Sequence, residues 1–267
     1  MSLKITLLNG DSSWLIELDG TRLLLDPWLV GDAVVVHPAM HVAHLGDAPR
    51  LSLSEVGPVD ALVISHPFPD HCNAPTLRLL PRDLPAFAPR VAQPAIPLLG
   101  GPRRVANIPN ATLGRRPAEF RSVELAWCRA TAPLDTTHNA LILRGRESGA
   151  TVMYCPHGLL REGRTMAAVE RTLAGRLDAF LCSFTLLDLP FYLGGIANLG
   201  VEKGVEVVRH LKPRYLLATH DAPKPDTGFI ARKAKITRCP DLVATVGERV
   251  RPSEVVVPET GRAWTAA

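Results

Sequence analysis

The chain has 267 residues, of which 46% are hydrophobic, so it is long enough for one large α/β domain or two small ones with a substantial core. The formal net charge of +4 is compatible with acidic substrates and does not imply nucleic-acid binding. Five cysteines, none of them in a CxxC pair, argue against a disulfide framework or a structural zinc knuckle and fit a reducing compartment.

The N-terminal part of the chain predicts a β-meander. Three short apolar runs lie at residues 4–8, 13–18 and 22–25. Asp19-Gly20 separates the last two runs, and an Asp-Gly pair between alternating strands predicts a two-residue hairpin. Residues 27–58 show no sustained period, so we expect a long loop there that could form a flap over a site.

The next apolar run leads into an unusual turn. Residues 59–65 are followed directly by His66-Pro67-Phe68-Pro69-Asp70-His71, and we expect residues 61–65 to form a buried strand. Two imidazoles and a carboxylate at the end of this strand then share one small volume. Nitrogen and oxygen donors in such an arrangement suit a divalent metal, and the segment is predicted to be a metal-binding loop.

The remainder of the chain alternates between strands and helices. Asn73-Ala74-Pro75-Thr76 predicts a helix start, because proline is favoured in the first turn of a helix. Further strands are expected at residues 86–88, 105–108, 120–126, 140–143, 151–154, 179–183 and 215–218, and helices at 93–99, 164–174 and 201–211. Two strand groups, each followed by helices, indicate an α/β architecture, and a single domain over residues 1–267 is the simpler interpretation.

Several polar residues follow predicted strands and are candidates for a site. His157 and His220 are candidate metal ligands, with loop-structuring histidines as the alternative. Asp26 is a further candidate, with a plain turn residue before proline as the alternative. Asp188 is a candidate for the border of the site, with a structural carboxylate as the alternative, because an isolated carboxylate among apolar residues needs a partner. Cys155 lies two residues from His157, and a buried cysteine is favoured over a nucleophile because no orienting third residue is identifiable.

The metal loop, Leu25-Asp26-Pro27 and Thr219-His220-Asp221 together resemble the metallo-β-lactamase superfamily, whose loop reads His-x-His-x-Asp-His. Within it, the chain is most similar to the ascorbate-6-phosphate-lactonase-like branch, with an atypical metal loop. The resemblance implies a four-layer αββα sandwich with a metal cleft at one edge. Phe68 stands where the family has its middle histidine, and His157 where the family usually has an aspartate that bridges two metals.

The resemblance also assigns roles to the candidates. It implies that Asp70, His71 and His220 bind a metal at the family's second site, with His157 as a further ligand. Asp26 would support this site through hydrogen bonds, and Asp188 would lie at its border. The first site would retain His66 but is depleted. His138 could substitute there only if its loop folds back. We therefore expect one divalent ion per chain, zinc or else manganese, with Asp70 or His66 managing the proton.

These observations predict a metal-dependent hydrolase that acts on a lactone, ester or phosphoester small molecule through a metal-activated water. The alternative is a binding or regulatory protein that kept the fold and lost the chemistry. A nuclease of the same fold would need additional nucleic-acid-binding modules, so no nucleic-acid partner is expected, and the oligomeric state stays open. Residues 5–8 are too short for a signal-peptide core, and charged, proline and glycine residues interrupt the stretch 177–199. We therefore expect a cytoplasmic protein without a membrane span.

Overall fold

The computed structural model describes residues 3–132 and 135–266. They form two compact units, neither of which is continuous in sequence. Unit 1 contains the chain up to Ile108, the segment Ala222–Lys233 and the residues from Glu259 on, and unit 2 contains Pro109–Asp221 and Ala234–Pro258. Each unit is built on one seven-stranded sheet. In the described part of the chain, every helix is too short or too polar to cross a membrane.

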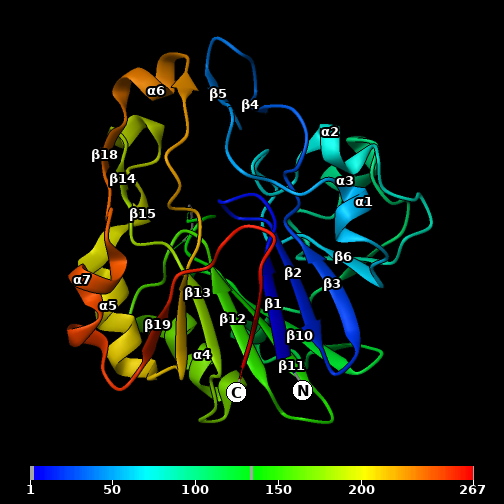
Figure 1. The fold of residues 1–267 in the computed structure, drawn as a ribbon, viewed down its shortest axis with the longest axis vertical. Helices are drawn as coiled ribbons and strands as arrows, with labels where there is room; N and C mark the ends of the chain where they lie inside the picture. Colours follow the sequence, from blue (N-terminus) through cyan, green and yellow to red (C-terminus); the bar gives the residue numbers. More distant parts are fainter. Residues whose placement is uncertain (1–2, 133–134, 267) are drawn as a thin grey trace. The chain divides into compact units, whose positions relative to one another are not determined.

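The sheet of unit 1 has the strand order β20-β1-β2-β3-β6-β7-β8, and its strands β1, β2 and β3 are seen side by side in Figure 1. Its strands are β1 (Leu3–Leu7), β2 (Trp14–Leu18), β3 (Thr21–Leu25), β6 (Ala61–Val63), β7 (Ala86–Ala88), β8 (Val105–Asn107) and β20 (Ala263–Thr265). The first three strands form the predicted antiparallel meander. Asp19 and Gly20 both have positive φ, as a two-residue hairpin turn of this kind requires. From β3 to β8 the strands are parallel.

The helices of unit 1 are short. They are α1 (Leu53–Val56), α2 (Ala74–Leu77), α3 (Ala95–Leu98) and α6 (Phe229–Lys233). The predicted helix start at residue 73 is confirmed, because the Asn73 side chain accepts a hydrogen bond from the backbone N–H of Thr76. Leu24 and Leu62 of the sheet belong to the same buried cluster as Leu77 of α2 and Ile96 of α3.

The prediction of an unstructured loop over residues 27–58 is wrong in part. Besides α1, this region contains an antiparallel pair, β4 (Ala33–Val35) and β5 (His41–Ala43), and β5 also pairs with β17 (Asp226–Thr227). Strands of three residues are too short to show a hydrophobic period. The partner β17 comes from a late part of the chain, so local sequence gives no indication of it.

The sheet of unit 2 has the order β19-β16-β13-β12-β11-β10-β9. Its strands are β9 (Ala118–Phe120), β10 (Val123–Cys128), β11 (Ala140–Gly145), β12 (Thr151–Cys155), β13 (Ala179–Cys182), β16 (Tyr215–Ala218) and β19 (Glu254–Val256). Pairing is antiparallel from β9 to β12 and parallel from β12 to β19. The strand predicted at residues 120–126 is in fact two strands, with Arg121 in a left-handed conformation (φ 49°) between them.

Three helices pack against the sheet of unit 2, namely α4 (Gly163–Leu173), α5 (Gly200–Leu211) and α7 (Leu242–Val246). Met153 and Phe180 of the sheet share a buried cluster with Val169 of α4, Val208 of α5 and Val246 of α7. A second, three-stranded sheet has the order β15 (Ile196–Leu199), β14 (Leu186–Asp188) and β18 (Lys235–Thr237) (Figure 1). The predicted α/β class, with mixed sheets and flanking helices, is confirmed.

In both units, polar residues follow the carboxyl ends of neighbouring parallel strands. In unit 1, Asp26 follows β3 and His66 follows β6. In unit 2, His157 follows β12, Ser183 follows β13 and His220 follows β16. Neighbouring parallel strands end at the same edge of a sheet, and this edge is where ligands bind in open α/β sheets.

Candidate metal centre

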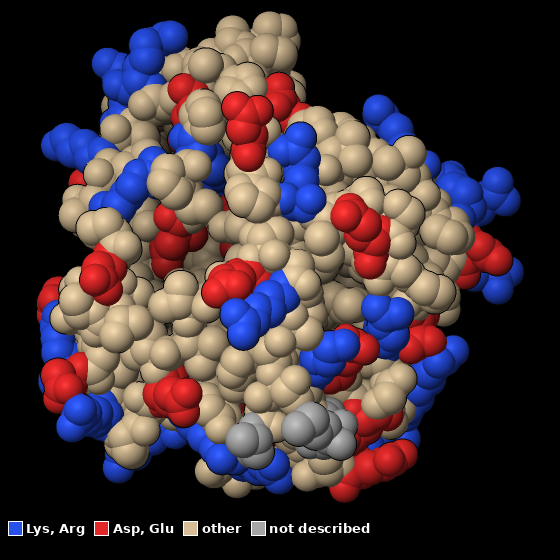
Figure 2. All heavy atoms as spheres, viewed as in Figure 1, with Lys and Arg blue, Asp and Glu red and all other residues tan. Residues whose placement is uncertain are grey.

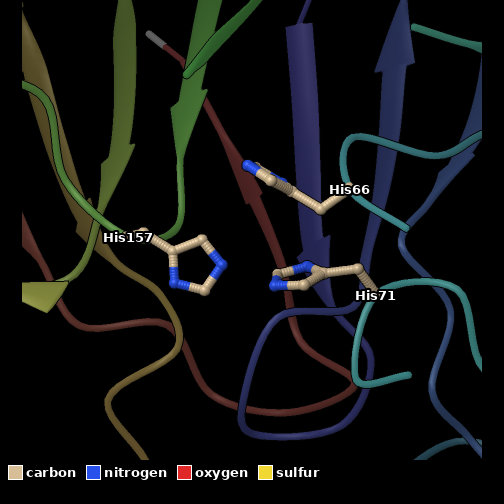
Figure 3. Close-up of side chains that lie close together, drawn as sticks. All are labelled: His66, His71 and His157. Atoms are coloured by element: carbon tan, nitrogen blue, oxygen red, sulfur yellow. The ribbon is translucent and has the colours of Figure 1, made fainter. Parts of the chain in front are cut away.

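Both histidines of the metal loop are buried. His66 is 2% exposed and His71 is fully buried, and both extend from the loop that follows β6 (Figure 3). Their ring centroids are 5.1 Å apart, and a potential ligand atom of each lies within 4.8 Å of the other. The Phe68 ring stacks on His66 at a centroid distance of 5.9 Å. Phe68 thus supplies an aromatic contact at the position where the family pattern has a histidine.

Asp26 sets the orientation of both rings. Its fully buried carboxylate accepts hydrogen bonds from Nδ1–H of His71 at 2.8 Å, from the backbone N–H of Ser65 at 2.7 Å and from the Ser65 hydroxyl. Because the hydroxyl proton of Ser65 goes to Asp26, its oxygen accepts from Nδ1–H of His66 at 2.7 Å. Each imidazole therefore carries a proton on Nδ1 and its lone pair on Nε2, the form in which histidine binds metal.

Negative charge surrounds His71. Burial by itself lowers the pKa of His71, but the carboxylates of Asp70, Asp26 and Asp11 outweigh this effect, so the pKa is raised. The Asp70 carboxylate lies 4.0 Å from Nε2 of His71, on the side of the ring opposite the bond to Asp26. A buried position surrounded in this way favours positive charge, whether carried by a proton or by a metal ion.

The loop backbone is fixed by hydrogen bonds within unit 1. The backbone N–H of His71 donates to the carbonyl of Phe68 at 2.9 Å, and the hydroxyl of Ser12 donates to the carbonyl of Asp70 at 3.2 Å. The Asp70 side chain is 23% exposed. Asp70 therefore has a fixed backbone and a side chain that contacts solvent.

In unit 2, His157 lies just beyond the end of β12 and is 6% exposed (Figure 3). Its Nδ1 lies 2.8 Å from Oδ1 of Asn198, a buried residue of β15. The backbone N–H of Leu199 donates to the carbonyl of His157 at 3.3 Å. One strand of the small sheet thus holds both the ring and the backbone of His157.

His220 lies beside His157. The ring centroids are 5.0 Å apart with an interplanar angle of 83°, and His220 adopts a left-handed backbone conformation with φ 61°. Next to it, Asp221 accepts hydrogen bonds from the backbone N–H groups of Phe184 and Thr185 and from the hydroxyl of Ser183. Asp221 therefore ties the end of β16 to the segment after β13. Non-glycine residues with positive φ are uncommon in proteins as a whole, but they are found more often at functional sites.

The remaining candidates also belong to unit 2. Asp188 is half-buried on β14 and pairs in register with Ile196 of β15 and Lys235 of β18. His138 is buried, and its Nδ1 lies 2.8 Å from the Asp135 carboxylate. Cys155 is fully buried, and burial raises the pKa of its thiol well above the usual value. The interpretation of Cys155 as a buried cysteine is confirmed. All five cysteines are free thiols.

Three residues of these hydrogen-bond networks are absent from the sequence-based candidates. Ser65 connects Asp26 to His66, while Ser183 and Asn198 connect Asp221 to His157. Ser65 is the last residue of a predicted strand and Ser183 directly follows the observed strand β13, which was an available indication. Asn198 had a weaker one, as the only strongly polar residue of its strand.

Comparison with known proteins gives one family match. The model of the beta-lactamase superfamily domain matches residues 4–220. A search of curated proteins finds no match.

Several solved structures share the fold. A possible metal-dependent hydrolase from Veillonella parvula is 17% identical with a TM-score of 0.71, and 99% of each chain is covered. An isothiocyanate hydrolase from Delia radicum gut bacteria is 12% identical with a TM-score of 0.68, again with 99% of each chain covered. Igni18, a metallo hydrolase from Ignicoccus hospitalis, is 18% identical with a TM-score of 0.62, over 99% of this chain and 98% of that one. At these identities the similarity shows the fold alone.

Proposed function

The chain belongs to the beta-lactamase superfamily, and from this premise we propose that it is a metal-dependent hydrolase. The superfamily and the fold that the sequence suggests are confirmed. The closer placement in the ascorbate-6-phosphate-lactonase-like branch is part of the proposal. The description of the Veillonella parvula protein as a possible metal-dependent hydrolase and that of Igni18 as a metallo hydrolase support this choice of reaction.

The proposed ligands are those that the family resemblance implies. Asp70, His71 and His220 would bind one divalent ion, with His157 as a further ligand. The observation that carries this proposal is the state of the buried imidazoles. In His66 and His71, hydrogen bonds occupy Nδ1 and place the lone pair on Nε2, and the carboxylates around His71 favour a cation. Nitrogen and oxygen donors of this kind suit zinc, with manganese as the alternative.

The surrounding residues have distinct parts in the proposed reaction. The ion, when bound, supplies Lewis acidity that makes water nucleophilic near neutral pH. Asp26 holds His71 in the binding tautomer, and Asp188 would lie at the border of the site. Asp70, which reaches solvent, or the buried His66 would accept the proton given up by the attacking water. The substrate would be a small molecule with a lactone, ester or phosphoester bond.

A screen of hydrolysis on metal-loaded protein tests this function. Wild type, His220→Ala and His210→Ala would be assayed on panels of lactones, thioesters, phosphodiesters and β-lactams with added zinc or manganese. His210 is an exposed residue of α5 that contacts Glu170, so its variant is a matched control. We expect wild type and the control to hydrolyse one class of compound and His220→Ala to be inactive. Equal activity in His220→Ala would contradict the proposal.

A binding or regulatory protein without catalysis is the second candidate. Two departures from the family pattern favour it, namely Phe68 stacked on His66 and a histidine at position 157. This alternative predicts that the protein hydrolyses none of the panels, and a protein that retains no metal would support it. Metal binding together with turnover would exclude it.

The proposed partners are small molecules. On the face drawn in Figure 2, basic and acidic side chains of the described residues are interspersed, in keeping with a net charge of only +4. Specific nucleic-acid binding commonly uses a concentrated basic surface. We therefore propose a cytoplasmic protein with neither a nucleic-acid nor a membrane partner, and its oligomeric state stays open.

A further inference from the structure

Asn198 is the residue through which the structure controls His157. We infer that a relay from Asp221 through Ser183 and Asn198 fixes the proton of His157 on Nδ1 and makes Nε2 its metal-binding atom. The metal-binding part of this inference rests on the proposed function. The tautomer is a property of the metal-free protein and is measured separately.

The direction of every hydrogen bond in the relay follows from the carboxylate at its root. The Asp221 carboxylate accepts from the backbone N–H groups of the two residues after Ser183, so it is an acceptor here as well and the hydroxyl proton of Ser183 goes to its Oδ1 at 2.7 Å. The Ser183 oxygen then accepts from the amide Nδ2 of Asn198 at 3.3 Å. With its nitrogen directed at Ser183, Asn198 turns Oδ1 toward His157, so the ring donates Nδ1–H across 2.8 Å.

Burial makes this polarity difficult to reverse. Ser183, Asn198 and His157 are 1%, 3% and 6% exposed, so bulk water competes poorly for these bonds. In the other tautomer, the lone pair of Nδ1 would face the amide oxygen of Asn198. Two buried acceptors, Nδ1 of His157 and Oδ1 of Asn198, would then face each other without a proton between them. Leaving buried polar groups without partners is costly. The relay therefore selects one tautomer of a ring that would otherwise exchange between two.

A second feature shows that β15 is shaped around this loop. Besides the bond from Asn198, the backbone N–H of Leu199 donates to the carbonyl of His157. Gly158 has φ +88°, and a Cβ at this position would lie 3.2 Å from the Leu199 side chain. A side chain on residue 158 would be strained and crowded, so glycine allows β15 to approach the loop closely. The His157 ring is thus fixed by its side-chain bond and by its backbone.

Unit 1 contains a shorter form of the same device. There Asp26 accepts from the Ser65 hydroxyl, which in turn accepts from Nδ1–H of His66. In unit 2 the side-chain amide of Asn198 stands between the serine and the histidine, so the relay has one more hydrogen bond. A neutral imidazole held in this way offers one lone pair, whereas a carboxylate can offer two oxygens to two ions. The relay therefore makes His157 a ligand for a single ion and not a bridge.

Nitrogen-15 NMR of histidine-labelled, metal-free protein tests the tautomer directly. The spectra would be recorded at about pH 8, where an imidazole of ordinary pKa is neutral, and His157 would be assigned from the signals missing in His157→Gln. We expect wild type to show protonated Nδ1 and unprotonated Nε2 at His157. Asn198→Asp keeps an acceptor beside Nδ1 and should retain this state. Asn198→Leu and Ser183→Ala should shift the ring toward protonated Nε2.

Zinc titration of the same proteins measures the consequence. Loss of a group that orients a metal-binding histidine typically weakens affinity about 10- to 100-fold, and we expect this for Asn198→Leu and less for Asn198→Asp. Asn139→Leu is the matched control. Asn139 is another buried amide of unit 2, bonded to the backbone of Ala130 and Thr136, so its loss should lower stability and leave the tautomer and zinc affinity unchanged.

The outcomes separate the relay from the proposed function. Protonated Nε2 at His157 in wild type would overturn the relay, as would an unchanged tautomer in both Asn198→Leu and Ser183→Ala. If Asn198→Leu does not fold, Ser183→Ala and the wild-type spectrum still decide. The expected tautomer in a protein that binds no zinc would refute the proposed metal site and leave the relay standing.

Discussion

Asp26 and Asp135 form similar pairs with histidine but differ in their surroundings. Asp26 accepts from His71 and from Ser65, and two further carboxylates act on the same histidine. Asp135 accepts from Nδ1 of His138 and from two backbone N–H groups of its own turn. The first pair lies among residues proposed to bind metal. The second pair fixes a local turn, and its effect should appear in stability alone.

The Asp135 pair gives a pH-dependent prediction. Burial raises the pKa of Asp135, but hydrogen bonds from His138 and the backbone outweigh it, so the pKa lies well below its usual value. A depressed carboxyl pKa stabilises the fold above the unfolded-state pKa of about 4, and this stabilisation is lost as the pH falls further. Asp135→Asn should therefore lower the free energy of unfolding by about 1 to 3 kcal/mol near neutral pH.

Urea unfolding of wild type and Asp135→Asn at a series of pH values measures this difference. We expect the two stabilities to converge as the pH falls below about 4, because the wild-type carboxylate then loses its advantage. A difference of the same size at every pH would mean that the charge on Asp135 contributes nothing.

At the scale of elements, the sequence predicts the long strands and helices well. Apart from β19 and β20, which were not predicted, the strands of both seven-stranded sheets and the helices α4 and α5 lie within a few residues of their predicted ranges, because each has an apolar period or a clear flanking turn. The short strands of the small sheets, such as β4, β5 and β15, were not predicted either. A segment of three or four residues has too few positions for a period, and its partners come from distant parts of the chain.

The same distinction explains what was predicted of the candidate site. His66, His71, His157 and His220 follow strands that the sequence predicts, so local pattern was sufficient to propose them. Asn198 acts on His157 only because β15 lies beside the loop after β12, and this contact is a product of tertiary structure. The orientation of the donor atoms therefore could not be predicted from the sequence.

Helix α5 provides a prediction at this scale. Gly204 lies within the helix, where alanine is normally favoured by about 1 kcal/mol. A Cβ at this position would lie 2.8 Å from the ring of Phe184, which is fully buried and follows Ser183. We expect Gly204→Ala to destabilise the protein by about 1 to 3 kcal/mol, as overpacking does.

Thermal unfolding of Gly204→Ala and of Lys203→Ala compares two alanines in the same helix. Lys203 is exposed and forms an ion pair with Glu206, so its replacement should change stability little. A stabilised Gly204→Ala would show that α5 can move away from Phe184 at little cost.

At the scale of the whole molecule, both ends of the chain belong to unit 1. The strand β20, near the C-terminus, pairs with β1, and the segment Ala222–Lys233 returns to unit 1 directly after His220 and Asp221. Neither unit can therefore be separated as one continuous fragment. We propose that residues 1–267 behave as a single domain despite the two compact units.

Differential scanning calorimetry tests this proposal. Cooperative unfolding of one domain gives a calorimetric enthalpy equal to the van't Hoff enthalpy, and we expect one such transition for the full chain. Two resolved transitions would show that the units unfold independently.

The central proposal is that Asp70, His71 and His220 hold one divalent ion. The most direct test is the zinc content of protein that has been loaded with zinc and then freed of unbound metal, measured for wild type, His71→Ala and the control His210→Ala. Circular dichroism would confirm that all three are folded. Our account predicts about one zinc per chain in wild type and in the control, as expected for a mononuclear site, and almost none in His71→Ala. A folded wild type without zinc, or equal retention by His71→Ala, would contradict it.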